Sequence, residues 1–115
     1  ILQVTNDHSI VGEMVRSGIL SDEDARTHPK RNVITRSLGA QPDVVAETPD
    51  SIELVRGDTF LLCSDGLTAY LSDIDLSVVL ATNAPEAACK KMVQMANEQG
   101  GRDNVTVQVI TIRDL

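Results

Sequence analysis

The strongest apolar pattern lies in the second half of the chain, where it predicts three helices. Between Pro85 and Gly100-Gly101, apolar residues recur at i, i+4, i+7 and i+8 and therefore share one helical face: Ala88, Met92, Met95 and Ala96. Proline suits the first turn of a helix and glycine its end, so this segment predicts the longest helix. Shorter helical patterns run from Leu67 to Leu71 and from Ile74 to Leu80.

Two apolar segments on either side of these helices predict β-strands. The segment from Phe60 to Cys63 is apolar without alternation, which is typical of a strand covered on both faces. From about Asn104 to Ile112, apolar and polar residues alternate, with Val105, Val107 and Val109 on one face. Gly57-Asp58 suits a two-residue hairpin turn that would pair Ile52–Val55 with the first strand.

The first half of the chain carries two signals for the start of a helix. Ser9 precedes an apolar stripe at helical spacing, which Gly18 ends. Ser21 and Asp24 form a capping-box arrangement at the start of a second, short helix. This helix should end before Pro29, because the residue preceding a proline is disfavoured in the helical region.

Weaker patterns in this half predict extended segments. Ile1–Thr5 alternates weakly, as a short edge strand would, and the residues from Asn32 to Gly39 look extended. Asp43–Glu47 is a further candidate strand. Strands joined by tight turns, with helices gathered elsewhere, predict an α+β domain with a largely antiparallel sheet. The length of 115 residues fits one such domain.

Composition narrows the classes of partner. The chain has 17 acidic and 10 basic residues and a formal net charge of −7, so we expect no binding to nucleic-acid phosphates. No apolar run reaches membrane-spanning length, so we expect no membrane partner. Cys63 and Cys89 lie among apolar residues, which indicates buried thiols and a cytoplasmic protein.

Two short segments carry the candidate chemistry. Asp65 follows the apolar strand that ends at Cys63, and Asp103 precedes the alternating strand near the end of the chain. If these strands are antiparallel neighbours, the end of one meets the start of the other at a common sheet edge. Both carboxylates would then converge. Mg²⁺ and Mn²⁺ prefer such oxygen ligands and keep several waters.

Neighbouring residues would support a metal site at this edge. Gly66 leaves room for an ion, a water or a phosphate to approach the backbone, and Asn104 can hold a carboxylate or a bound water. Asp-Gly and Asp-Asn are also common turn sequences, so turn chemistry stays an alternative for each segment alone. His8 and His28 lack a partner histidine at metal-binding spacing and are interpreted as structural or surface residues.

The motifs resemble those of the metal-dependent protein phosphatases of the type 2C family, in its bacterial Ser/Thr branch. Leu62–Leu67 is similar to the family's strand-ending metal motif, and Gly101–Thr106 to its last metal motif. Thr5–Ser9 with Glu13–Val15, and then His28–Gly39, are similar to the segment that leads into and forms the flap beside the active site. The three matches follow the family's order over nearly the whole chain.

The resemblance implies a four-layer α/β/β/α sandwich with mainly antiparallel sheets. Residues 1–115 would be the C-terminal portion of this domain, with a flap-like region at about 5–39 and metal-binding strands and helices at about 43–115. Asp65 and Asp103 would bind metal, supported by Gly66 and Asn104. The implied cofactor is Mg²⁺ or Mn²⁺, in a two-metal centre of the complete enzyme.

The family's N-terminal motifs, with their phosphate-binding arginine and bridging aspartate, have no counterpart in this sequence. Two divalent ions bring four positive charges, of which Asp65 and Asp103 offset half. We therefore expect the chain alone to have little or no phosphatase activity, and we assign no catalytic residue within it.

The implied function is hydrolysis of phosphoserine and phosphothreonine in proteins by metal-activated water, as part of a longer chain. Expected partners are phosphorylated proteins, with Ser/Thr kinases among the candidates, and a second copy of the chain through an exposed sheet face. Two alternatives stay open. One is a non-catalytic regulatory or binding module with this fold. The other is a phosphatase relative in a partner-switching pathway, although the flap-like stretch favours the Ser/Thr branch.

Overall fold

The computed structural model describes residues 1–114 and divides into two compact units. The N-terminal unit runs from Leu2 to Ser51, and the C-terminal unit from Ile52 onward, together with Ile1. Among the described residues, no helix has the length and apolar character needed to cross a membrane.

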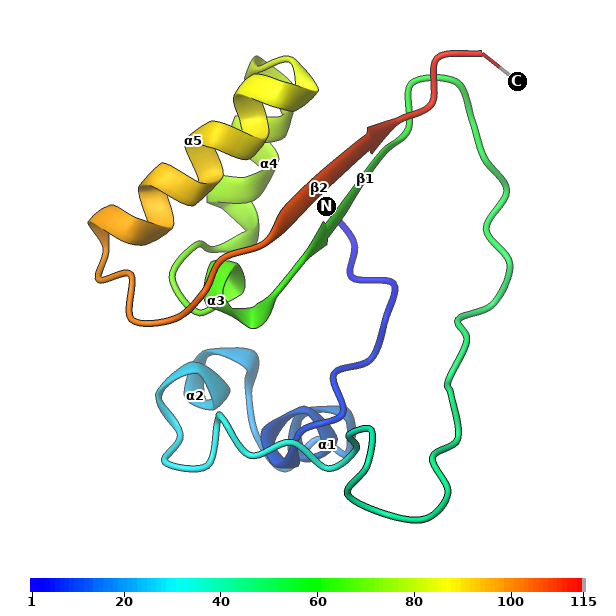
Figure 1. Ribbon diagram of the computed structural model, residues 1–115, viewed down its shortest axis with the longest axis vertical. Coiled ribbons are helices and arrows are strands. Elements are labelled where there is room, and N and C mark those ends of the chain that lie inside the picture. Colours follow the sequence, from blue (N-terminus) through cyan, green and yellow to red (C-terminus); the bar gives the residue numbers. More distant parts are fainter. Residues whose placement is uncertain (115) are drawn as a thin grey trace. The chain divides into compact units, whose positions relative to one another are not determined.

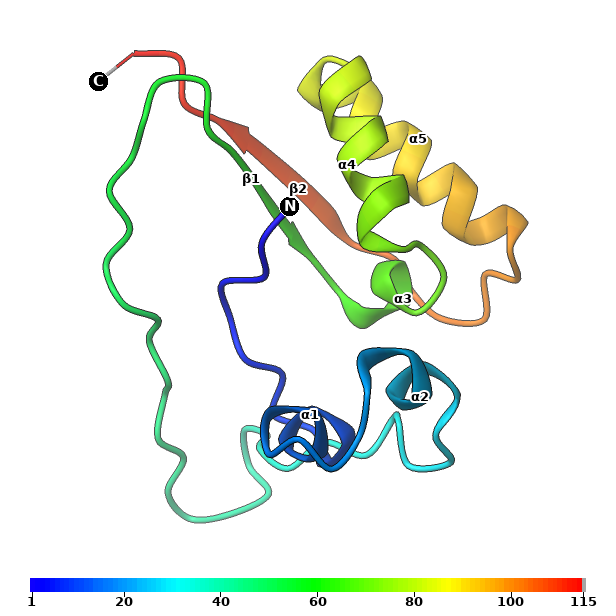
Figure 2. The same cartoon turned by 180° about the vertical axis from the view of Figure 1, so that it is seen from behind.

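The C-terminal unit is built on a two-stranded antiparallel ladder (Figures 1 and 2). Strands β1 (Thr59–Cys63) and β2 (Val107–Thr111) pair in register from Thr59 opposite Thr111 to Cys63 opposite Val107. Three helices lie between the strands in the sequence: α3 (Asp65–Thr68), α4 (Asp73–Thr82) and α5 (Pro85–Glu98). The antiparallel pairing and the predicted helices are confirmed, and the unit is α+β. The strands are connected through helices, however, and not by a tight turn.

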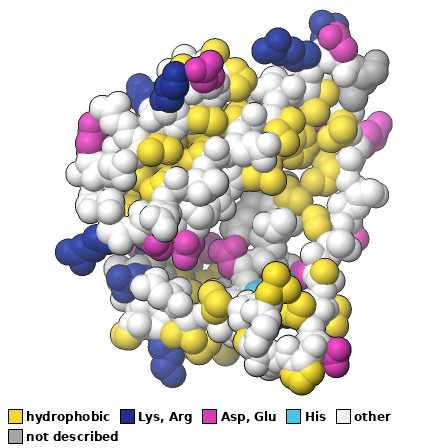
Figure 3. Space-filling view, in the orientation of Figure 1, with side chains coloured by type: hydrophobic (Ala, Val, Ile, Leu, Met, Phe, Trp, Pro, Cys, Tyr) yellow, Lys and Arg dark blue, Asp and Glu magenta, His cyan; other side chains and the backbone are white. Residues whose placement is uncertain are grey.

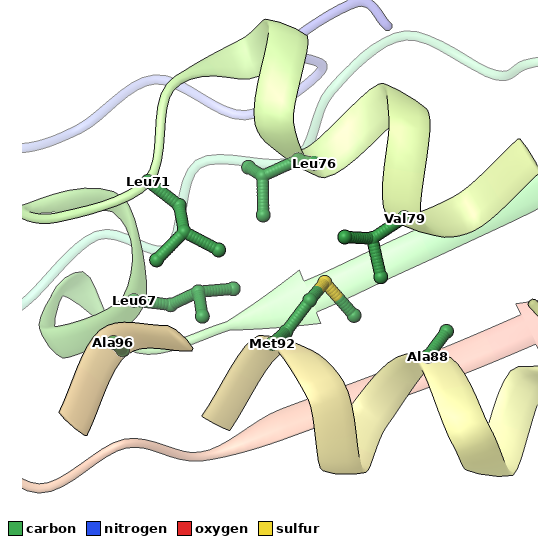
Figure 4. Close-up of a cluster of buried hydrophobic side chains, with 7 residues drawn as sticks. All are labelled: Leu67, Leu71, Leu76, Val79, Ala88, Met92 and Ala96. Atoms are coloured by element: carbon green, nitrogen blue, oxygen red, sulfur yellow. The ribbon is translucent and has the colours of Figure 1, made fainter. Parts of the chain in front are cut away.

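The core of this unit lies between α3, α4 and α5 on one face of the ladder (Figure 4). Its buried side chains are Leu67, Leu71, Leu76, Val79, Ala88, Met92 and Ala96. Leu61 of β1 and the alternating residues Val107 and Val109 of β2 pack against this cluster. The predicted apolar face of α5 is therefore confirmed, because three of its four residues are fully buried and Met95 packs beside them.

The other face of the ladder remains partly open. Leu62 and Ile110 are exposed, at 51% and 42%, and Phe60 is half-buried. The prediction that this strand is covered on both faces is wrong for the described residues, because only one helical layer packs on the ladder. Other exposed apolar side chains are spread over the visible surface (Figure 3).

Local capping explains where the helices begin and end. Ser72 and Asp75 form a capping box at the start of α4: the Asp75 N–H donates to the Ser72 hydroxyl, and the Ser72 N–H donates to the Asp75 carboxylate. Pro85 is the first residue of α5, as predicted. After α5 the chain turns through Gly100 and Gly101, whose φ angles of +144° and +51° favour glycine.

The N-terminal unit contains two short helices, α1 (Ile10–Arg16) and α2 (Asp22–Thr27). The Ser9 hydroxyl accepts the N–H of Gly12, and the Ser21 hydroxyl accepts the N–H of Asp24. Both caps were predicted from the sequence and are confirmed. Gly18, at φ +75°, follows the end of α1 as expected.

Four predicted strands are absent from the described residues. Ile1–Thr5, Asp43–Glu47 and Ile52–Val55 form no strand. The region from Asn32 to Gly39 consists of turns, a bend and irregular backbone, with one isolated bridge between Ser9 and Ile34. A short extended segment needs a partner to complete its hydrogen bonds, and β1 pairs with β2 instead. The turn at Gly57 does form, with the Asp58 N–H donating to the Val55 carbonyl at 3.0 Å, but it joins no hairpin.

Candidate metal centre

Asp65 lies where β1 passes into α3. It is the first residue of that helix, with Ser64 in the extended N-cap conformation before it. Its backbone carbonyl accepts the N–H of Ala69 at 2.9 Å, and its side chain is exposed. The short helix therefore fixes the backbone of Asp65 while leaving the carboxylate accessible.

Three hydrogen bonds from Ser64 extend the contact between the strands beyond the ladder. The Ser64 N–H donates to the Thr106 carbonyl at 3.0 Å, and the Thr106 N–H donates to the Ser64 hydroxyl at 3.0 Å. The same hydroxyl donates to the Asn104 carbonyl at 3.2 Å. The residue before Asp65 is thus bonded to the residue after Asp103. Both predicted ligands lie at the same end of the ladder, where β1 ends and the chain enters β2 (Figure 1).

The predicted supporting residues, Gly66 and Asn104, touch each other at this point. Gly66 is buried, and a Cβ atom there would collide with the carbonyl oxygen of Asn104. A glycine at this position therefore lets the two backbone segments approach closely. Asn104 contributes through its backbone, since its N–H donates to the Asp103 carboxylate at 2.7 Å and its carbonyl accepts from Ser64.

Asp103 follows the glycine turn after α5 and is exposed. One of its carboxylate oxygens, Oδ1, accepts the Asn104 N–H, which orients the side chain and leaves the second oxygen for another partner. Two exposed carboxylates at one ladder end fit a hard divalent cation that keeps most of its waters. Among residues 1–114, no group of three or more His, Cys, Asp or Glu side chains is placed to hold a metal ion. Asp65 and Asp103 alone would therefore supply only part of a metal's ligands.

Two residues of this region were missed by the sequence analysis. Ser64 joins the two segments, and Tyr70 accepts the N–H of Arg102 at 3.3 Å through its phenol oxygen. The available signals were weak: a serine just before Asp65, as an N-cap residue would be, and the only tyrosine in the chain. Neither signal identifies a contact partner more than thirty residues away.

A separate polar cluster lies within the N-terminal unit. The Nε2 of His8 is 2.6 Å from the Glu47 carboxylate, and the Asn6 amide donates to the other carboxylate oxygen at 2.6 Å. The hydrogen bond from His8 lowers the pKa of the Glu47 carboxyl below its usual value. Asn6 and the nearby Arg36 guanidinium act on that pKa in the same direction. His8 thus has a structural contact, in agreement with its interpretation from the sequence.

Comparisons with known proteins show which proteins this chain resembles. No protein-family model matches it. The protein phosphatase PhpP of Streptococcus pneumoniae is 37% identical over 113 residues, which cover 97% of this chain and 46% of that protein. The chain is homologous to bacterial type 2C serine/threonine phosphatases. It spans about half the length of the curated relatives that it matches.

Solved structures of these phosphatases align with nearly the whole chain. The serine/threonine phosphatase PstP/Ppp of Mycobacterium tuberculosis is 34% identical, with a TM-score of 0.87 over 98% of this chain and 47% of that chain. The catalytic domain of the phosphatase PstP in complex with two manganese ions is 33% identical, with a TM-score of 0.82 over 97% of this chain and 45% of that chain. The type 2C resemblance of the sequence motifs is therefore confirmed as homology over half of a phosphatase domain.

Proposed function

We propose that this chain is the C-terminal part of a metal-dependent phosphatase that hydrolyses phosphoserine and phosphothreonine in proteins. Asp65 and Asp103 are its contribution to a two-metal centre for Mg²⁺ or Mn²⁺. The observation that carries this proposal is the hydrogen bonding of Ser64 to Asn104 and Thr106, which brings the two aspartate segments together. The two manganese ions in the homologous PstP structure support the choice of metal.

The residues of this chain would hold a divalent cation and orient the carboxylates that bind it. Asp65 and Asp103 supply carboxylate oxygens from one ladder end, and the Asn104 N–H fixes one oxygen of Asp103. A bound divalent cation supplies a Lewis acid that makes its coordinated water more acidic. Because both carboxylates are exposed, an ion held by them would be accessible to a phosphorylated side chain.

The complete domain would be a four-layer α/β/β/α sandwich, with its remaining ligands outside this chain. Two carboxylates balance two of the four positive charges of a two-metal centre, so the second ion would be held weakly here. We therefore propose that the chain alone has little or no phosphatase activity.

We also propose that the chain self-associates through the open face of the ladder at Leu62 and Ile110. Sedimentation at increasing protein concentration would test this proposal.

The proposed substrates are phosphorylated proteins, Ser/Thr kinases among them, in the cytoplasm. The net charge of −7 supports a protein substrate over nucleic acid, because an acidic surface repels a phosphate backbone. Incubating the complete protein with a phosphorylated kinase domain and measuring the release of phosphate would test this choice.

The test of the central proposal is a chimeric enzyme. The part of the Streptococcus pneumoniae phosphatase that matches this chain, 46% of its length, is replaced by this chain. The chimera is assayed with a phosphothreonine peptide and Mn²⁺. We expect activity, and we expect Asp65→Asn and Asp103→Asn each to reduce it by at least about 100-fold, since losing even an outer-shell partner costs roughly 10–100-fold.

A matched control is available at the opposite end of the same ladder. Asp114 is 86% exposed and lies 3.6 Å from Arg56, a surface ion pair of small energetic value. Asp114→Asn should leave the activity within about twofold, as expected for a surface change. A folded chimera that keeps full activity without the carboxylates of Asp65 and Asp103 would refute the proposal. A folded but inactive chimera would favour a non-catalytic module instead.

A further inference from the structure

The turn that leads into Asp103 is tethered by the side chain of Tyr70. This tyrosine follows α3, its N–H donates to the Leu67 carbonyl at 3.1 Å, and its half-buried ring packs against the core cluster. Its phenol oxygen accepts the N–H of Arg102 at 3.3 Å. The residue immediately before Asp103 is thus bonded to a side chain anchored in the core.

Gly100 provides the space for this tether. A Cβ atom at Gly100 would lie 3.2 Å from Cε1 of the Tyr70 ring and 3.3 Å from its phenol oxygen. Both distances are closer than ordinary van der Waals contact. The backbone of Gly100 also has φ +144°, which disfavours other residues. The turn therefore lies directly against the ring, and a larger residue at this position would displace one or the other.

A second hydrogen bond holds the backbone on the other side of Asp103. The Ser64 hydroxyl donates to the Asn104 carbonyl at 3.2 Å, just after Asp103, whereas Tyr70 holds Arg102, just before it. Ser64 and Tyr70 in turn stand on either side of the segment that begins with Asp65. The backbone on each side of Asp103 is consequently bonded to a side chain that flanks the Asp65 segment.

We propose that Tyr70 is a positioning residue for the metal centre, which keeps Asp103 in place beside Asp65. This inference rests on the proposed function, because it requires Asp103 to bind the ion. Without the phenol oxygen, the backbone before Asp103 loses its bond to the core while the bond from Ser64 remains, and the fraction of molecules with both carboxylates in place falls. The expected loss in Mn²⁺ affinity is roughly 3–10-fold, the effect of one neutral hydrogen bond, which is smaller than the effect of losing a partner bonded directly to a metal ligand.

The test compares Tyr70→Phe with the unaltered 115-residue chain. Phenylalanine keeps the ring in the core, so the thermal unfolding midpoint should change little. The affinity is measured from the fall of the free Mn²⁺ signal in electron paramagnetic resonance. We expect weaker Mn²⁺ binding together with faster hydrogen exchange of the Arg102 amide. Thr111→Val, which removes a hydroxyl 3.4 Å from that of Thr59 at the opposite ladder end, should leave the Mn²⁺ affinity unchanged.

A double-mutant cycle separates this inference from the proposed function. If Tyr70 acts through Asp103, Tyr70→Phe has no further effect on Mn²⁺ affinity once Asp103→Asn is present. Unchanged affinity in Tyr70→Phe, with a large loss in Asp103→Asn, would overturn the positioning role and leave the proposed function intact. Unchanged affinity in Asp103→Asn would overturn both.

Discussion

In the C-terminal unit the helices share one cluster of seven buried apolar side chains, whereas among residues 2–51 Val11 is the buried apolar residue. The N-terminal unit is held largely by polar contacts: the caps at Ser9 and Ser21 and the hydrogen bonds of Glu47 with His8 and Asn6. Apolar burial contributes more free energy than exposed hydrogen bonds do. The predicted metal ligands therefore lie on the unit with the stronger apolar core, while the stability of the other unit depends on a few polar side chains.

The largest expected effect comes from opening the core of the C-terminal unit. Met92 is fully buried, so Met92→Ala should lower the free energy of unfolding by about 2–5 kcal/mol. Lys91→Ala, at the exposed neighbouring position of α5, should change it by no more than about 0.5 kcal/mol. Urea denaturation followed by circular dichroism measures both. Equal effects of the two substitutions would mean that this core does not stabilise the unit.

A smaller effect is expected when the serine N-cap is removed from one helix of each unit. Ser9→Ala removes the cap of α1, and Ser72→Ala removes the cap of α4, each at a cost of about 1 kcal/mol. The seven-residue α1 has one buried residue, whereas α4 has two, Leu76 and Val79. We therefore expect amide exchange to accelerate strongly through α1 and only at the first turn of α4. Equal acceleration in the two helices would contradict the comparison.

The smallest effect is a dependence on pH at the Glu47 cluster of the N-terminal unit. The pKa of Glu47 is held below its usual value, first by the hydrogen bond from His8, so its stabilising contribution is present at neutral pH. This contribution decreases as the pH falls below the usual range for a glutamate and through the lowered pKa. The reporter is the Thr35 amide, which donates to the His8 carbonyl at 2.7 Å.

We expect the amide signal of Thr35 to shift over this acidic range in the unaltered chain, and Glu47→Gln to remove the shift. Glu23→Gln, at an exposed position of α2, serves as the control and should leave the shift in place. A Thr35 signal that titrates identically with and without the Glu47 carboxylate would show that the cluster does not respond to acid in this way.

The parts of the fold that could be predicted from sequence are those that local interactions determine. The caps at Ser9 and Ser21, the proline in the first turn of α5 and the apolar face of that helix depend on neighbours within one or two helical turns, and the structure confirms each of them. The strand predictions failed at Asp43–Glu47 and Ile52–Val55. A strand needs a partner, and the identity of that partner is not encoded in a five-residue pattern.

The residues of the candidate site likewise fall into those that a local motif predicts and those that depend on distant contacts. Asp65 and Asp103 were found because each stands beside an apolar strand in a recognisable motif. The roles of Ser64 and Tyr70 were not found, because they depend on backbone groups of Asn104, Thr106 and Arg102 that approach only in the folded chain. Motifs therefore identified candidate ligands, and the structure was needed to see what holds their segments together.

The most direct test of the shared-ion claim is to locate Mn²⁺ on the isotope-labelled chain by paramagnetic broadening of amide signals. We expect the signals of residues 64–66 and 102–104 to broaden first and together, while those of Thr59 and Thr111 at the opposite ladder end stay sharp. Broadening that reaches only one of the two segments, or that spreads evenly over the acidic residues of the chain, would contradict it.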